Sequence, residues 1–162
     1  MCPALPPPAD AADAARVLYF AYGSNLDREQ MLERCASARP RFRARLDHHR
    51  LDFTYPSQRW HGGAADVVAC PDSMVWGAVY ELAAADVAVL DGFERGYERV
   101  ALDVRDDVDA VHRVLSYTVC VKQSTPPHAI YLEKMLRWGA LWGLPADYLA
   151  VLEALRRIPP AG

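Results

Sequence analysis

Apolar and polar positions along the first 121 residues form short runs that are typical of β-strands. Strands are predicted at Arg16–Tyr22, Pro40–Leu46, Arg50–Tyr55, Ala64–Cys70, Val75–Leu82, Glu98–Val104 and Arg113–Val121. The polar segment Pro56–Gly63 is expected to form a loop between two of these strands, and the acidic residues Asp106, Asp107 and Asp109 a turn between the last two. The first part of the chain is therefore expected to build a sheet.

Helical patterns are fewer and gather toward the C-terminus. Asp27 can cap a first short helix, with Gln30 three positions later. Pro126-Pro127 breaks the chain before the last two helices, and Gly143-Leu144-Pro145 separates them. The predicted helices are Arg28 to about Cys35, Ala83 to about Phe93, about His128–Trp142 and about Ala146–Arg156. Strands followed by helices favour an α+β fold over a doubly wound parallel sheet.

Composition is consistent with one globular domain. The chain has 162 residues, of which 52% are hydrophobic and 24% charged, and its net charge is −3. We expect a loose, flexible Pro/Ala-rich tail at residues 1–15 and a single domain at residues 16–162. The tail has no basic cluster before an apolar core, so it is not a secretory signal. No apolar run approaches the roughly 20 residues that a membrane helix needs.

Neither the cysteines nor the basic residues indicate a special partner. The four cysteines lie far apart and form no CxxC pair, which predicts a reduced, cytoplasmic protein. In the basic cluster Arg39–Arg45 the charges alternate with Phe42 and Ala44, as expected of a strand with one solvated face. We therefore expect no nucleic-acid surface and no membrane association.

Several common kinds of active site lack their signatures. His48, His49, His61 and Cys70 show no HxH, HxxxH or CxxC spacing, so we expect no metal site. No cysteine lies in surroundings that would lower its pKa, so a Cys–His nucleophile is unsupported. Gly62-Gly63 lacks the Lys and Ser/Thr of a phosphate-binding loop.

The stretch Tyr19-Phe20-Ala21-Tyr22-Gly23-Ser24-Asn25-Leu26 is the most informative part of the chain. It reads as a strand, a tight turn and the start of a helix. Such a junction directs backbone N–H groups and the positive end of a helix toward one point, where an anion or an oxyanion can bind. Many strand–helix turns that contain Gly and Ser bind nothing, so by itself the pattern leaves a structural role open.

Glu94 is the least ordinary carboxylate. It lies between Phe93 and Tyr97, where a mostly apolar helix meets a strand. Burial beside aromatic surface would raise the pKa of Glu94 from about 4.3 toward the value that a general base needs at neutral pH. The alternative is a loop glutamate that pairs with Arg95 or Arg99, and the residues alone leave both open.

Motifs in a shared order and approximate spacing, from about Leu18 to Ile158, make the chain resemble the γ-glutamylcyclotransferase family. Asn25 directly after Ser24 differs from the Leu that is usual in the glutathione-specific cyclotransferases. The residues that carry the resemblance are Tyr19-Phe20-Ala21-Tyr22-Gly23-Ser24-Asn25-Leu26, Ala44-Arg45-Leu46, Leu51-Asp52-Phe53, Trp60-His61-Gly62-Gly63-Ala64, Val75-Trp76-Gly77, Leu90-Asp91 with Glu94, Pro126-Pro127, Tyr131, Gly139-Ala140 and Gly143-Leu144-Pro145 with Tyr148.

The resemblance implies a small mixed β-barrel flanked by helices and an enzyme of glutathione metabolism without a cofactor. Similar enzymes convert a γ-glutamyl amino acid into 5-oxoproline and a free amino acid, because the substrate's α-amino group attacks its own γ-carbonyl. By this resemblance Glu94 is the catalytic carboxylate. The segment Tyr19–Ser24, with Asn25 and Leu26, is the substrate-binding turn. A homodimer is left open.

Three departures from the family pattern lie where the leaving amino acid should bind. Arg95 follows Glu94, where family members commonly have Gly. The segment from Glu94 to Tyr97 is shorter than in the animal enzymes, where a tyrosine contacts the substrate. A second tyrosine of the animal enzymes that touches substrate aligns best with Lys122. Tyr97 and Lys122 are therefore candidate substrate-binding residues, and Arg95 or Lys122 would meet an anionic leaving group or face solvent.

Two other functions stay open at this point. The same chemistry could act on γ-glutamylamines or on a γ-glutamyl-protected biosynthetic intermediate. A member without activity could simply bind a small γ-glutamyl ligand, although a binder of a zwitterion gains little from a base at Glu94.

Overall fold

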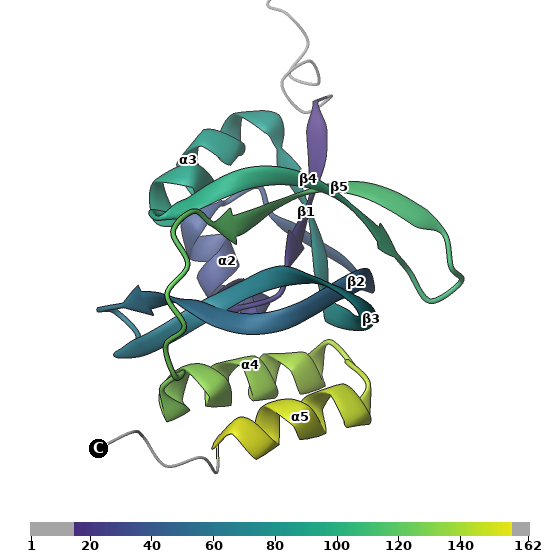
Figure 1. Ribbon diagram of the computed structural model, residues 1–162. Coiled ribbons are helices and arrows are strands. Elements are labelled where there is room, and N and C mark those ends of the chain that lie inside the picture. The colour runs from purple at the N-terminus through teal and green to yellow at the C-terminus, as the bar shows by residue number, and fades with distance from the viewer. Residues whose placement is uncertain (1–14, 157–162) are drawn as a thin grey trace, which may run out of the picture.

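The computed structural model describes residues 15–156. Within them, five strands close into a mixed barrel in the order β1–β3–β2–β4–β5, with four α-helices packed around it (Figure 1). The predicted α+β fold with a small barrel is confirmed. The predicted tail, apart from Ala15, lies outside the described residues.

The barrel combines two long strands with three shorter ones. β1 pairs with β3 in antiparallel fashion along its whole length, and it meets β5 in parallel at Tyr19 and Leu115, which closes the barrel. The strands are β1 (Arg16–Ala21), β2 (Arg39–Ser57), β3 (Gly62–Ala83), β4 (Tyr97–Arg105) and β5 (Val111–Val119). The helices are α2 (Arg28–Arg34), α3 (Val87–Phe93), α4 (Ala129–Leu141) and α5 (Ala146–Arg156), with 3₁₀ helices η1 (Ser24–Leu26) and η2 (Ala84–Asp86).

The two long strands correct the sequence prediction, which divided each of them in two. The register between β2 and β3 shifts between Asp47 and His49, where His48 has a φ of 60° and its Nδ1 lies 2.9 Å from the carbonyl oxygen of Pro71. A bulge of this kind accommodates turn-forming residues while pairing continues on both sides. The interruption at His48 is therefore a bulge within the β2–β3 hairpin, and the strand continues beyond it.

The connection between β2 and β3 is shorter than predicted. Pro56 and Ser57 still belong to β2, and Gly62-Gly63 already belongs to β3, so the loop is reduced to residues 58–61. The Gly63 amide donates to the carbonyl of Pro126, and a Cβ on Gly63 would lie 2.0 Å from the carbonyl oxygen of Thr125. Glycine is needed here because the chain that leads from β5 to α4 crosses directly over the strand.

The predicted cap of the first helix is confirmed. Asp27 accepts hydrogen bonds from the amides of Glu29 (2.9 Å) and Gln30 (3.1 Å). Its other oxygen pairs with Lys134 of α4 at 2.7 Å, which ties α2 to the C-terminal helices. The helix predicted from Ala83 begins later, because Ala83 ends β3 and the α-helix starts at Val87.

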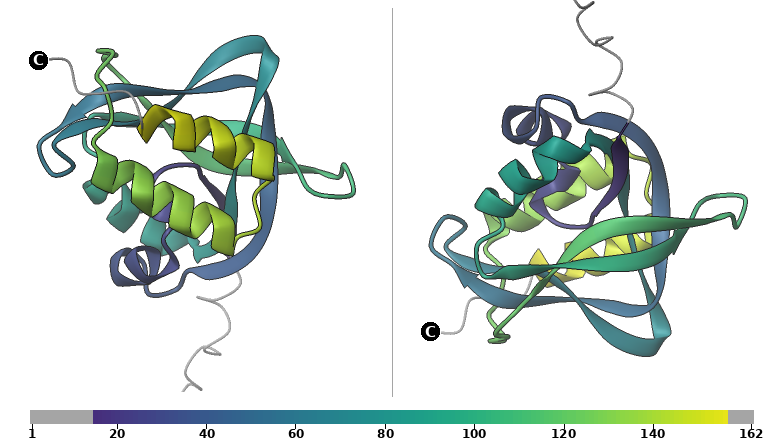
Figure 2. Two further views of the ribbon diagram at one scale, coloured as in Figure 1. Left: turned by 90° about the horizontal axis from the view of Figure 1, so that it is seen from below. Right: turned by 90° about the horizontal axis from the view of Figure 1, so that it is seen from above.

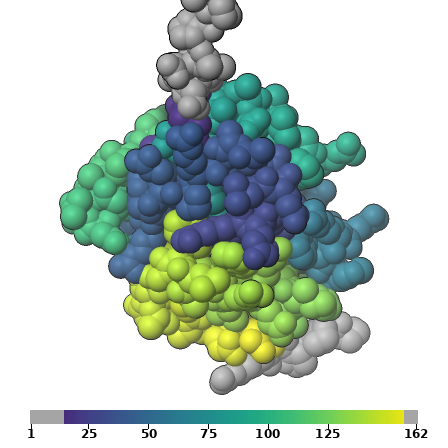
Figure 3. All heavy atoms as spheres, turned by 180° about the vertical axis from the view of Figure 1, so that it is seen from behind, coloured from purple at the N-terminus to yellow at the C-terminus, as the bar shows by residue number. Residues whose placement is uncertain are grey.

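The two C-terminal helices lie side by side beneath β2 and β3 (Figures 1 and 2). Gly143 adopts a φ of +72° between them, and the amide of Leu144 donates to the carbonyl of Gly139. Both helices have their predicted extents to within a residue or two. Seen from behind, α2 and the start of β2 pack directly against α4 (Figure 3).

Ion pairs neutralise the basic cluster on β2. Arg41 pairs with Glu81, Arg43 with Asp107 and Arg45 with Asp109, so the acidic turn between β4 and β5 faces the arginines. This is the solvated strand face that the sequence predicts. No helix among residues 15–156 is both long and apolar enough to span a bilayer.

Candidate active site

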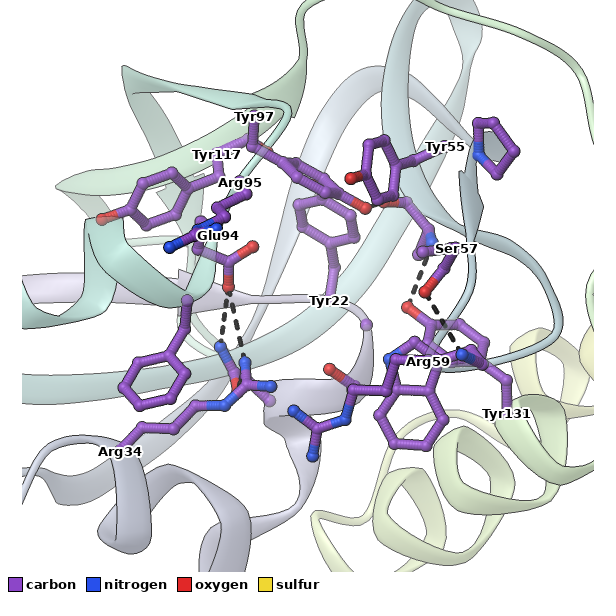
Figure 4. Close-up of a pocket in the computed structure, with 18 of the residues that line it drawn as sticks. Tyr22, Arg34, Tyr55, Ser57, Arg59, Glu94, Arg95, Tyr97, Tyr117 and Tyr131 are labelled. Atoms are coloured by element: carbon purple, nitrogen blue, oxygen red, sulfur yellow. Dashed lines mark hydrogen bonds and ion pairs between the residues drawn. The ribbon is translucent and has the colours of Figure 1, made fainter.

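A cavity of about 420 Å³ lies where the end of β1, the α3–β4 junction and the β2–β3 hairpin meet (Figure 4). Tyrosine side chains and polar groups make up much of its wall. The lining residues are Tyr19, Tyr22, Gly23, Ser24, Asn25, Arg34, Tyr55, Pro56, Ser57, Gln58, Arg59, Trp60, Ala64, Ala65, Phe93, Glu94, Arg95, Tyr97, Tyr117 and Tyr131. Concave sites of this size are typical of small-molecule binding.

The turn after β1 supplies one wall of the cavity. Of the predicted binding turn, the residues that line the cavity are Tyr19, Tyr22, Gly23, Ser24 and Asn25. The other three, Phe20, Ala21 and Leu26, are at most 1% exposed and belong to the core. The structure thus brings five of these eight residues to the cavity, and the other three support the turn from beneath.

Backbone amides of this turn remain outside the helical hydrogen-bond ladder. The first two bonds of η1 run from the Leu26 amide to the Gly23 carbonyl and from the Asp27 amide to the Ser24 carbonyl, both 3.1 Å. The amides of Ser24 and Asn25 precede them. The Tyr80 hydroxyl donates to the Asn25 carbonyl at 2.8 Å and the Trp142 indole to the Leu26 carbonyl at 2.9 Å, which fixes the turn against the core.

Gly23 is required by a close approach within the wall. A Cβ at this position would lie 2.7 Å from the Tyr131 hydroxyl oxygen and 3.2 Å from the Cβ of Ala65. The Tyr131 hydroxyl accepts a hydrogen bond from the Ala65 amide at 3.0 Å, so it cannot easily move aside. Any side chain at position 23 would displace Tyr131 of α4 from the cavity.

Glu94 lies at the C-terminal end of α3, where its amide caps the helix by donating to the carbonyls of Leu90 and Asp91. Its Oε1 accepts a hydrogen bond from Asn25 Nδ2 at 3.1 Å, across 69 positions of sequence (Figure 4). Arg99 pairs with Asp91 instead of Glu94. The pairing with Arg99 left open by the sequence is therefore wrong, and the carboxylate faces the cavity.

Asn25 holds the centre of a polar network. Its Nδ2 also donates to the Tyr19 hydroxyl at 3.0 Å, and its Oδ1 accepts from Gln30 Nε2 at 2.9 Å and from Arg34 Nη1 at 3.1 Å. The Arg34 guanidinium lies 3.9 Å from Glu94 Oε1 and stacks over the Phe93 ring at 5.0 Å. With both ends of its amide engaged, Asn25 has one possible orientation, and it positions Glu94.

Burial raises the pKa of Glu94 to about 7. Arg34 and the hydrogen bond from Asn25 act in the opposite direction by favouring the carboxylate, and Asp91 adds a smaller upward effect. The pKa is thus raised, as expected from the sequence, and burial is the main cause. A carboxyl group with a pKa near neutrality can both take up and release a proton at physiological pH.

The raised pKa makes folding stability depend on pH. Between pH 4.5 and about 7 the folded state holds a proton on Glu94 that the unfolded state releases, so raising the pH through this window lowers stability. Glu94→Gln removes this dependence. We expect the variant to match wild type near pH 4.5 and to be more stable above pH 7, by about 3 kcal/mol. Urea unfolding at several pH values measures the difference, and a difference that does not vary with pH would contradict the assignment.

Tyr97 lies in the cavity, as proposed from the sequence. Its hydroxyl donates to the Ala65 carbonyl at 2.8 Å, and its ring packs beside Tyr55 with centroids 5.4 Å apart. Burial raises its pKa well above the ordinary value, so it remains a neutral phenol. Ala65 thus holds two cavity tyrosines, Tyr97 through its carbonyl and Tyr131 through its amide.

Lys122 does not line the cavity. Its ammonium group pairs with the fully buried Asp66 at 2.5 Å and donates to the Val119 carbonyl at 3.1 Å. The Lys122 side chain is 43% exposed, so of the two alternatives it faces solvent, with Asp66 as its partner within the protein. Of the two candidate cations, Arg95 alone reaches the cavity.

Many of the cavity residues were not recognised from the sequence as site residues, and Arg34, Arg59 and Trp60 are three of them. Arg34 ends α2, and Arg59 and Trp60 lie on the β2–β3 hairpin. An aromatic residue within an otherwise polar loop was the available signal for Trp60. Arg34 gave no such signal, because a basic residue in the last turn of a helix is ordinary. Among the described residues, no group of three or more His, Cys, Asp or Glu is placed to hold a metal ion.

Comparisons with known proteins find relatives in both sequence and fold. Residues 74–152 match the model of the AIG2-like family. A γ-glutamylcyclotransferase from Bos taurus is 34% identical over 152 residues, which cover 88% of this chain and 80% of that protein, and the one from Homo sapiens is 35% identical with the same coverage. A solved structure of a γ-glutamyl cyclotransferase superposes with a TM-score of 0.81 at 33% identity, covering 90% of this chain and 89% of that one.

Proposed function

Because this chain belongs to the γ-glutamylcyclotransferase family, we propose that its cavity converts γ-glutamyl amino acids into 5-oxoproline and the free amino acid. The observation that carries the proposal is the Glu94 carboxyl, which lines the cavity, has a pKa of about 7 and is held by Asn25 of the turn after β1. The reaction is proposed from the family, and Glu94 with Asn25 is the pair of residues proposed to perform its proton transfer.

In the proposed mechanism Glu94 is the general base. The substrate's α-amino group is mostly ammonium at neutral pH and cannot attack until it loses a proton. Glu94 accepts that proton, the nitrogen forms a bond to the γ-carbon, and the bond from that carbon to the leaving nitrogen breaks. Glu94 returns that proton to the leaving nitrogen as the bond breaks. The ring nitrogen still carries a second proton, which it gives up through Glu94 to the leaving amine. The ring nitrogen thus becomes the neutral lactam N–H of 5-oxoproline, and the amino acid leaves as an ammonium.

The turn after β1 is proposed to bind the γ-glutamyl half of the substrate. Attack on the γ-carbonyl gives a tetrahedral intermediate with a negative oxygen, and the amides of Ser24 and Asn25 can donate to it. The substrate contains its own nucleophile, so the enzyme needs mainly to fold the γ-glutamyl arm into a near-ring geometry. Confinement between the turn and Glu94 supplies this proximity, which can contribute several kcal/mol.

The direct test is release of 5-oxoproline from γ-glutamyl amino acids by the purified protein. We expect turnover, with kcat/KM rising with pH through about 7, because only ionised Glu94 can accept the proton. The rise in kcat/KM reports the free enzyme, which is the state that the structure describes. Binding of these compounds without any release of 5-oxoproline would instead favour a non-catalytic binding protein.

We also propose a cytoplasmic location. Support comes from the thiols of Cys35, Cys70 and Cys120, which are free. Burial raises the pKa of Cys35 to about 11, so this thiol is unreactive. The single-domain boundaries and a homodimer remain predictions from the sequence.

A further inference from the structure

Among the charged side chains that line the cavity, positive ones outnumber negative ones. Three are arginines, Arg34, Arg59 and Arg95, and one is a glutamate, Glu94. Arg34 and Glu94 are partly satisfied by each other and by Asn25. Within the described part of the chain, neither Arg59 nor Arg95 makes an ion pair. With Glu94 ionised, the cavity therefore holds two positive charges in excess.

The unpaired arginines lie at the mouth of the cavity, one on each side. Arg95 directly follows Glu94 at the α3–β4 junction, and Arg59 lies on the β2–β3 hairpin, where its guanidinium stacks on Trp60 at 5.0 Å (Figure 4). Both residues are exposed, whereas the Arg34 side chain is only 8% exposed. The cations thus form two layers, with Arg34 beside the base and Arg59 and Arg95 farther out.

The proposed function fixes how a substrate would lie between these layers. Its α-amino group must reach Glu94 on the inner wall, and the γ-carbonyl must lie within bonding reach of that amine. The leaving group, attached to the same carbonyl, then extends outward to the mouth. A leaving amino acid carries a carboxylate of its own at this end, whereas an alkylamine carries none.

We propose that Arg59 and Arg95 form a binding site for the carboxylates of the leaving group. Among γ-glutamyl amino acids, the enzyme then prefers those with an acidic leaving residue. The inference rests on the proposed cyclotransferase function and names its substrate class. Arg59 and Arg95 make no ion pair within the described part of the chain, so both guanidinium groups can form charge-assisted hydrogen bonds to a carboxylate of the ligand.

The test compares three substrates at pH 8 that differ in the charge of the leaving group: γ-glutamylglutamate, γ-glutamylalanine and γ-glutamylethylamide. We expect kcat/KM to fall about tenfold at each step in this order. Arg59→Gln or Arg95→Gln should lower kcat/KM for γ-glutamylalanine about tenfold, mainly through KM, and that for the ethylamide less than about twofold. Arg137→Gln, which removes an exposed charge from α4, is the matched control and should change neither.

The outcomes separate this inference from the function on which it rests. Equal kcat/KM for the ethylamide and γ-glutamylalanine, or equal losses on all three substrates in the arginine variants, would overturn the carboxylate site and leave the cyclotransferase intact. No 5-oxoproline from any of the three substrates would overturn both. Addition of 0.5 M NaCl should narrow the differences among substrates, because screening weakens exposed charge pairs.

Discussion

Glu94→Gln is expected to lower kcat/KM for γ-glutamylalanine by about 10² to 10⁴-fold, which is the range that a positioned general base contributes. Glutamine keeps the size of the side chain and an oxygen that can accept from Asn25, which lies 3.1 Å from Glu94 Oε1. It cannot take a proton from the substrate ammonium group. Shape and the central hydrogen bond are thus preserved, and basicity is removed.

The loss should appear in kcat, with KM changed less. The network around Asn25 stays connected through Gln30 and Arg34, so the turn that binds the γ-glutamyl group keeps its form. The same variant is expected to be more stable than wild type above pH 7, so unfolding cannot explain lost activity. Rate and stability should therefore change in opposite directions.

Glu98→Gln provides the matched control. Glu98 lies on β4 four residues after Glu94, is exposed and does not line the cavity. This variant should keep the wild-type rate to within about twofold, as expected of a surface change remote from the reacting atoms. If Glu94→Gln retains wild-type kcat/KM, the base is another group and the assignment fails.

The largest expected effect on stability comes from Asp66→Ala. Asp66 is fully buried, and its Oδ2 accepts from the Thr54 hydroxyl at 2.7 Å and from Lys122 at 2.5 Å. Its Oδ1 accepts from the amides of Val67 and Val119 at 2.9 and 3.1 Å. Alanine leaves several of these buried donors without an acceptor. We expect a loss of about 3 to 5 kcal/mol in the free energy of unfolding.

Asp103→Ala is the control for this prediction, because Asp103 pairs with Arg113 on the outside of the barrel. The two side chains are 57% and 67% exposed, so the change should cost no more than about 1 kcal/mol. Urea unfolding of both variants at one pH measures the two losses. Similar losses in the two variants would show that burial of Asp66 contributes little.

Local sequence signals predicted the fold well where a single residue or motif determines where a helix begins or ends. The Asp27 cap, the break at Gly143 and the two C-terminal helices all appear where expected. The same reasoning divided β2 near His48 and β3 near Pro71, where the apolar and polar pattern is interrupted. In the structure these residues lie in a bulge, and cross-strand pairing on both sides outweighs their local preference.

Prediction of the site likewise succeeded for short motifs and failed for residues whose role depends on distant neighbours. The sequence singled out the turn after β1 and Glu94, and the structure places Asn25 and Glu94 in hydrogen-bond contact. It did not single out Arg34 or Arg59, whose role depends on what lies across the cavity. Lys122 was a candidate because of its position in the sequence, but in the folded protein its ammonium group forms an ion pair with Asp66.

The sequence by itself determined the element types, the family and the two segments that meet in the site, because these follow from short-range patterns and ordered motifs. Only the tertiary structure decided which charges face the cavity and what state they are in. The pKa of Glu94 rises to about 7 because burial removes water from the carboxyl group, and burial is a property of the closed barrel. Arg59 and Arg95 are far apart in the chain, and both line the cavity because the closed barrel brings the β2–β3 hairpin and the α3–β4 junction together.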